Sequence, residues 1–144
     1  MVVQSIKCSL CGALKKDKKR SLCDKCKYQR RKVSQERDVV QYLGNRLSIA
    51  KKRSKRRNLE FSITLSNLLD LWESQKGICA VTNFPMTHTE GNFDFAVSLD
   101  RIDNAQGYVE GNVRLVCSRV NVMRNDLDIE MLGFWCRAVV NNEN

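Results

Sequence analysis

Four of the seven cysteines stand in two pairs near the N-terminus, and thiolates are strong zinc ligands. Cys8 and Cys11 form one C-x2-C pair, Cys23 and Cys26 form the other, and eleven residues separate the pairs. Each pair can turn two thiolates toward one point, and Gly12 can adopt the positive φ that a zinc knuckle often needs there. The spacing predicts one closed structural Zn²⁺ site, with free or redox-active thiols as the alternative.

The other three cysteines do not form a comparable set. Cys79 and Cys117 are followed at the same spacing by Thr82 and Val120, and two thiolates alone do not close a zinc site. Cys136 falls within the apolar pattern of the last predicted helix. We expect all three to pack in the core.

A second group of chemically capable residues lies in the string SLDRIDNAQGYVEGNVRLVCSRVNVMRND. Asp100 and Arg101 stand near the end of one predicted strand, Asn112 opens the next, and Asn121 and Arg124 lie in the helix that follows. From these residues alone, the simplest interpretation is a salt bridge between Asp100 and Arg101 at the strand end, beside a turn.

The wider pattern resembles the HNH, or ββα-metal (His-Me finger), nuclease family, in its phage-type variant. The resemblance covers about residues 50–130, and some nucleases of this superfamily also carry a four-cysteine zinc knuckle. It implies a small ββα-metal core that hydrolyses phosphodiester bonds. The matching elements are Cys79, Thr82, Ser98–Asp103, Gly107-Tyr108, Gly111–Val113, Asn121 and Arg124.

The resemblance also implies a role for each matching residue. Asp100 and Asn121 would ligate one divalent cation, Mg²⁺ or Mn²⁺, because such ions prefer oxygen ligands. Asn112 would tie the loop between the strands. Arg101 and Arg124 would add positive charge beside the phosphate in the transition state.

The general base is the point at which this chain departs from the family pattern. The family has His directly after the metal-binding Asp, whereas this chain has Arg101, and arginine is not deprotonated in proteins. The sole histidine, His88, stands about twelve positions before Asp100 and is one candidate for the base. The alternative is that His88 is an exposed loop residue without a catalytic role. Tyr42, Tyr108 and a metal-bound hydroxide are the other candidates.

Charge is distributed unevenly along the 144 residues. Residues 1–57 hold 19 Lys and Arg against 4 Asp and Glu, whereas residues 58–144 hold 6 against 12. The densest cluster ends a predicted helix and could contact phosphates, with a solvated helix end as the alternative. Its basic residues are Lys51, Lys52, Arg53, Lys55, Arg56 and Arg57.

Helices and strands must position these candidate site residues, and the periodicity of hydrophobic residues predicts where those helices and strands lie. Thr64 or Ser66 can cap the N-terminus of a helix predicted to end near residue 77. We expect an α+β fold, with a ββα-metal core flanked by helices, an N-terminal four-cysteine zinc knuckle and a basic helix. The predicted elements are a helix within 27–57, a helix from 65 to about 77, strands over 95–102 and 112–116, and helices from 118 and over 129–140.

Three segments follow from these patterns. We predict a zinc-binding segment over 1–30, a basic helical DNA-binding segment over 31–57 and an HNH-like domain over 58–144. The sequence has no apolar run long enough for a transmembrane helix and no signal-peptide core, which predicts a cytosolic protein without a membrane partner. The phage-type resemblance implies that the cell is a bacterium or a phage-infected host.

Three functions remain open at this point. The first is a metal-dependent endonuclease acting on double-stranded DNA, as a homodimer if it cuts palindromes. The second is a DNA-binding protein that keeps the HNH scaffold but has impaired catalysis. The third is an RNA-binding zinc protein, which the 7% aromatic content disfavours.

Overall fold

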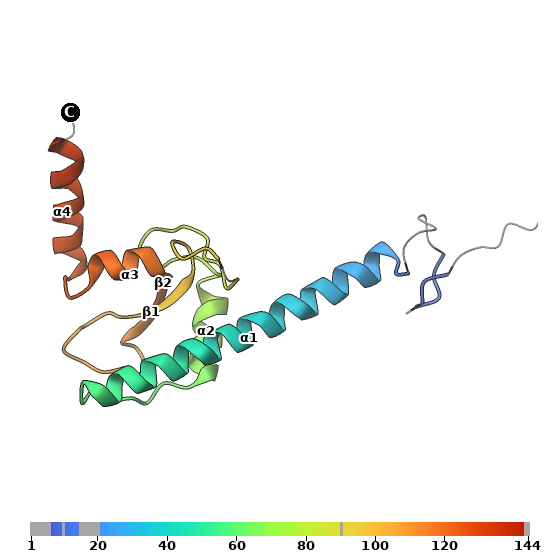
Figure 1. The fold of residues 1–144 in the computed structure, drawn as a ribbon, viewed down its shortest axis with the longest axis horizontal. Coiled ribbons are helices and arrows are strands. Elements are labelled where there is room, and N and C mark those ends of the chain that lie inside the picture. Colours follow the sequence, from blue (N-terminus) through green and yellow to red (C-terminus); the bar gives the residue numbers. More distant parts are fainter. Residues whose placement is uncertain (1–6, 10, 15–20, 90, 143–144) are drawn as a thin grey trace, which may run out of the picture. The chain divides into compact units, whose positions relative to one another are not determined.

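The computed structural model describes residues 7–9, 11–14, 21–89 and 91–142, with the side chains of residues 28–37 outside the description. The chain divides into two compact units, Met1–Val39 and Val40–Asn144. Helices and a two-stranded antiparallel sheet confirm the predicted α+β class (Figure 1). In chain order the elements are α1 (Asp24–Arg56), α2 (Leu65–Ser74), β1 (Val97–Arg101), β2 (Val113–Cys117), α3 (Ser118–Arg124) and α4 (Ile129–Asn142).

The first unit is organised by a tight turn after Cys8. The N–H of Cys8 donates to the carbonyl of Ala13 at 2.8 Å, and Gly12 has a φ of 72°, the positive value that the sequence predicts. The hydroxyl and the N–H of Ser9 both donate to the carbonyl of Ser21, each at 3.1 Å. These bonds bring the segments that carry the two cysteine pairs together.

Strands β1 and β2 pair in a register that places Asp100 directly opposite Arg114. Strand β2 passes directly into α3 at Ser118, which completes a ββα unit. Strand β1 is shorter than the strand predicted over 95–102, since Ala96 forms a bridge to a preceding loop. The loop between the strands, residues 102–112, supplies Asn104 and Tyr108 to the groove described below.

Helix α2 is fixed at both ends by side-chain hydrogen bonds. Thr64 caps its start, as predicted, because the N–H of Asn67 donates to Thr64 Oγ1 and the N–H of Thr64 donates to Asn67 Oδ1. At the other end, the amide of Gln75 donates to the carbonyl of Leu115 at 2.8 Å and accepts from its N–H at 3.0 Å. Gln75 therefore pairs with β2 as a neighbouring strand would.

The core of the second unit lies where α1, α2 and the strands meet. Leu43 of α1, Leu68 of α2 and Leu115 of β2 are fully buried. Each such side chain contributes about 1.5–3 kcal/mol through burial. The hydroxyl of Tyr42 also donates to the carbonyl of Val97 at 3.1 Å. These contacts hold the C-terminal part of α1 against the sheet.

Helix α4 leaves most of its apolar side chains in solvent. Leu132 is its buried residue, and Trp135 is 53% exposed. The core position predicted for Cys136 is wrong, because α4 contacts α3 alone among the described elements and Cys136 is exposed. No helix in the described part of the chain is long and apolar enough to cross a bilayer.

Candidate functional site

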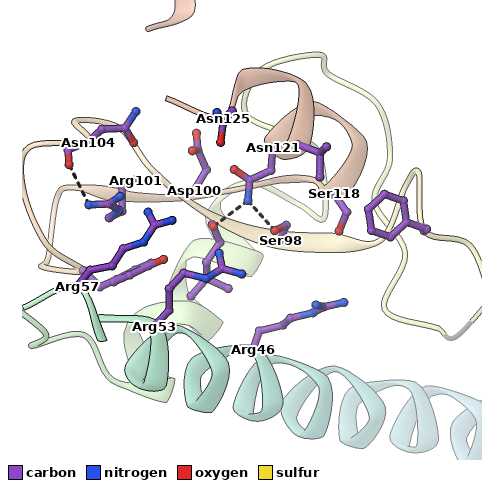
Figure 2. Close-up of a pocket in the computed structure, with 14 residues that line it drawn as sticks. Arg46, Arg53, Arg57, Ser98, Asp100, Arg101, Asn104, Ser118, Asn121 and Asn125 are labelled. Atoms are coloured by element: carbon purple, nitrogen blue, oxygen red, sulfur yellow. Dashed lines mark hydrogen bonds between the residues drawn. The ribbon is translucent and has the colours of Figure 1, made fainter. Parts of the chain in front are cut away.

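A groove of about 400 Å³ lies among the C-terminal part of α1, strand β1 and helix α3 (Figure 2). It brings the predicted residues Asp100, Arg101 and Asn121 together with arginines of the basic helix. The lining residues are Arg46, Arg53, Arg57, Phe93, Ser98, Leu99, Asp100, Arg101, Asn104, Tyr108, Ser118, Asn121, Val122 and Asn125.

Asp100 is almost completely buried, and both of its carboxylate oxygens contact arginines. Arg114 donates from Nε to Oδ2 at 2.8 Å. Arg124 donates from Nε to the same oxygen at 3.2 Å, and its Nη2 lies 3.2 Å from Oδ1. A buried carboxylate is stable only with such partners. A salt bridge therefore exists at this strand end, but with Arg114 and Arg124 and not with Arg101.

Arg124 is 1% exposed, and its guanidinium donates to protein acceptors. Nη1 donates to the carbonyl of Leu127 at 2.7 Å, Nη2 donates to the carbonyl of Arg101, and Nε donates to Asp100. This burial argues against the phosphate contact predicted for Arg124, because the side chain would have to leave these partners. In the structure, Arg124 ties α3 to β1.

Asn121 presents its amide in a fixed orientation. Its Nδ2 donates to Ser98 Oγ at 2.8 Å and to the carbonyl of Leu99 at 3.1 Å, as Figure 2 shows. No described residue donates to its Oδ1. The oxygen of Asn121 is therefore available to a ligand in the groove.

Arg101 is held in place by the loop that follows its strand. Its Nη1 donates to the carbonyls of Asn104 at 2.9 Å and Gln106 at 2.8 Å. Its guanidinium carbon lies 5.4 Å from the centre of the Tyr108 ring, within range of a cation–π contact. The groove thus contains a positive charge at a fixed position.

Asn112 ties the loop between the strands, which is the role that the family resemblance implies. Its Oδ1 accepts from the N–H of Asp103 at 2.9 Å, and its Nδ2 donates to the carbonyls of Asp103 and Gly107. Gly107 is required here because a Cβ atom would lie 2.1 Å from the carbonyl oxygen of Glu60. This loop sets the positions of Arg101 and Tyr108.

Three arginines line the groove and form what we call the arginine row: two lie in α1, and Arg57 directly follows its last residue. Arg46, Arg53 and Arg57 recur at i, i+7 and i+11, which places them on one face of a helix. Figure 2 shows Arg46 and Arg53 of α1, and Arg57 just after it, extending toward the strand that carries Asp100. The sequence reasoning missed Arg46 because it lies outside the dense cluster, although its helical spacing could have revealed it.

The structure divides the predicted basic strip into two groups. Arg53 and Arg57 line the groove. Among the described residues, Asp100 is the sole acidic one in the groove lining, and it already contacts two other arginines, so no described carboxylate in the lining matches the charge of the row. The remaining members are exposed outside the lining: Lys51, Lys52, Lys55 and Arg56.

The candidate metal ligands Asp100 and Asn121 both line the groove, whereas only one of the three candidate general bases does. The ring of His88 packs edge-on against Trp72, with 5.8 Å between ring centres, and His88 does not line the groove. Tyr42 lines a neighbouring hollow. Tyr108 is the candidate that the structure brings into the groove lining.

The donor chemistry of the groove fits a cation of the Mg²⁺ type. Asp100 Oδ1 has one ion-pair contact and keeps a lone pair, and Asn121 supplies a neutral oxygen. Mg²⁺ commonly takes one or two carboxylates and fills its other positions with water and substrate phosphate. The arginines on Asp100 repel a cation, so the negative charge of a phosphate would strengthen its binding.

The four predicted zinc ligands form a cluster in the first unit. The sulfur atoms of Cys8, Cys11, Cys23 and Cys26 all lie within 4.8 Å of one another, an arrangement that could hold a metal such as zinc. The Cys11 and Cys23 sulfurs are 3.6 Å apart. Tetrahedral Zn–S bonds of about 2.3 Å separate sulfurs by about 3.8 Å. Hydrogen bonds that the Cys26 thiol donates to Cys11 and Cys23 raise its pKa to about 12, so metal binding must release protons.

Comparisons with known proteins return two similarities, and no protein-family model matches the chain. The first is to an uncharacterized 29.0 kDa protein of the dda-modA intergenic region of Enterobacteria phage T4, 37% identical over 100 residues. The match covers 69% of this chain but 37% of the phage protein, so the chain spans little more than a third of its relative. The second is to the structure of the rare-cutting HNH restriction endonuclease PacI, with 16% identity, a TM-score of 0.49 and 94% of each chain covered.

Proposed function

We propose that this chain is a metal-dependent DNA endonuclease of the HNH type, which hydrolyses phosphodiester bonds of double-stranded DNA in the groove. One observation carries the proposal: the arginine row faces Asp100, Arg101 and Asn121 across a single groove. A groove lined by arginines without matching carboxylates favours a polyanion. A polyanion held there lies against the residues that the resemblance assigns to hydrolysis.

The length of the arginine row suits a nucleic-acid strand. Arg46 and Arg57 are eleven residues apart, which corresponds to about 16 Å along a helix. Phosphates of one DNA strand advance about 3.4 Å per nucleotide along the duplex axis. The row can therefore follow roughly five nucleotides of one strand.

Each groove residue has its own role in the proposed hydrolysis. Asp100 and Asn121 would hold a Mg²⁺ or Mn²⁺ ion, which would neutralise phosphate charge and lower the pKa of bound water. Arg101, anchored by the loop, stabilises the charge that develops on the phosphate. We assign the general-base role to the phenolate form of Tyr108, which would accept the proton of water and become the phenol, in preference to His88, because Tyr108 lines the groove.

The first unit has a separate role in this proposal. A zinc ion held by the four clustered thiolates leaves no open position for substrate, so it would stabilise the fold of a segment too short to form a large apolar core. The exposed Lys7 and Lys25, next in the chain to cluster cysteines, would add to the affinity for phosphates.

The proposal is tested by incubating supercoiled plasmid with the full-length chain and Mg²⁺ or Mn²⁺. We expect nicked or linear DNA in the presence of metal and none with EDTA. Asn121→Ala removes a proposed metal ligand, and Asn141→Ala is a matched control on the exposed surface of α4. Cleavage that survives EDTA, or equal cleavage by the two variants, would contradict the proposal.

A second candidate function is DNA binding without cleavage on the same scaffold. It is favoured by the two arginines that already neutralise Asp100 and by the lack of histidine in the groove lining. Salt-dependent binding with no cleavage of supercoiled, linear or branched DNA by either metal would select this function.

A further inference from the structure

A second hollow, of about 510 Å³, adjoins the groove. The two share Arg46 and Phe93 in their linings, so these side chains stand where one space passes into the other. The hollow lies between α1 and the loop before β1. The lining residues that matter here are Tyr42, Asn45, Arg46, Ile49, Asn92 and Phe93.

The lining of the hollow matches a planar group with a polar edge. Phe93 and Ile49 supply apolar surface, and the side chains of Asn45 and Asn92 can each donate and accept hydrogen bonds. None of the described residues that line the hollow carries a carboxylate. Arg46 places a positive charge where the hollow meets the groove. Aromatic side chains that stack on bases and amides that bond their edges are the usual means of recognising an unpaired nucleobase.

Phe93 is exposed but held in place. It is 55% exposed, and the Arg119 guanidinium carbon lies 5.3 Å from its ring centre. Arg119 also forms an ion pair with Asp94 at 2.7 Å, and the carbonyl of Phe93 accepts from the N–H of Ala96 at 3.3 Å. An aromatic ring held at the junction of two spaces is positioned to stack on a ligand that enters either one.

We infer that the hollow binds a nucleobase unstacked from the strand that lies along the arginine row, with Phe93 stacked on that base. The inference rests on the proposed function and goes beyond it, since it predicts which DNA the chain prefers. Extracting a base costs least when the base is already unpaired. The chain should therefore favour DNA with a mismatched or bulged nucleotide over a fully paired duplex.

The experiment measures binding of the full-length chain to fluorescent 30-base-pair duplexes without divalent metal. One duplex is fully paired and the other carries a single-nucleotide bulge. Phe93→Ala removes the stacking ring. Phe84→Ala is the matched control, because Phe84 is also 55% exposed but packs against Phe95 and lines neither space.

We expect the wild-type chain and Phe84→Ala to bind the bulged duplex at least about fivefold more tightly than the paired one, the lower limit for stacking of one base. Phe93→Ala should bind the two duplexes equally, and Phe93→Trp should restore the preference.

Two results would overturn the inference and leave the proposed function intact: equal binding of both duplexes by the wild-type chain, or an unchanged preference in Phe93→Ala. Failure of the wild-type chain to bind either duplex would instead contradict the proposed function.

Discussion

The cysteine cluster and the groove differ in what each would need to hold a metal. The cluster has four thiols within 4.8 Å of one another and can complete a tetrahedral site without help. The groove offers one carboxylate and one amide, and two arginines already contact the carboxylate. A metal in the cluster would therefore be part of the fold, whereas a metal in the groove would depend on the substrate.

The largest expected effect comes from removing the carboxylate of the groove. Asp100→Ala leaves the buried Arg124 and the half-buried Arg114 without their shared partner. Breaking a buried ion pair costs about 3–5 kcal/mol, so we expect a loss of that order in the free energy of unfolding, together with loss of cleavage. Urea denaturation measures the first and plasmid nicking the second; a variant as stable as the wild type would contradict the ion-pair network.

The second prediction concerns the cluster. Replacing one ligand, as in Cys23→Ser, should lower the zinc content from about one ion per chain to near zero, because three thiolates no longer close the site. Elemental analysis of the purified chain measures this. Cys136→Ser, an exposed cysteine outside the cluster, is the control and should retain zinc. Zinc retained at the wild-type level in Cys23→Ser would contradict the assignment of the four cysteines as the zinc site.

The features that could be predicted from sequence are those fixed by local geometry. The C-x2-C spacing and the cap at Thr64 depend on residues close in the chain, whereas the loop bonds of Asn112 are expected only from the family resemblance. Their physical causes, ligand spacing and the satisfaction of backbone groups, are readable without the tertiary structure.

The features that could not be predicted depend on contacts between distant elements. The pairing of Asp100 with Arg114 follows from the register of the two strands, and its pairing with Arg124 follows from the packing of α3. The division of the basic strip depends on which face of α1 covers the sheet. His88 does not line the groove, and its ring packs edge-on against Trp72, a residue of a different element.

A third prediction compares the two groups of basic residues in the segment 51–57, at the end of α1. The double variant Arg53→Gln with Arg57→Gln should weaken DNA binding and reduce the slope of log K against log salt by roughly two, if each arginine contacts one phosphate. The matched double variant, Lys51→Gln with Lys55→Gln, removes the same charge outside the groove and should preserve cleavage better. Equal losses of cleavage in the two would mean that the groove has no special role.

The smallest expected effect is a pH dependence at the loop beside Arg101. Hydrogen bonds from the N–H of Ala105 and the side chain of Gln106 lower the pKa of Asp103 below its ordinary value. A lowered pKa in the folded state stabilises the fold above the unfolded value of about 4, and this stabilisation is lost as the pH falls through the folded value. The Tm difference between wild type and Asp103→Asn should therefore shrink below about pH 4. A difference that is constant between pH 7 and pH 3 would contradict this role.

The central claim is that the groove is a metal-dependent hydrolytic site, and single-turnover cleavage of a labelled duplex tests it most directly. The rate is measured for the wild type and for Asn121→Ala over a range of Mg²⁺ concentrations, with circular dichroism confirming that the variant is folded. We predict cleavage by the wild type that requires Mg²⁺ and falls at least about tenfold in Asn121→Ala, because the cation loses a ligand. Equal rates for the two proteins, or cleavage that continues in EDTA, would contradict the account.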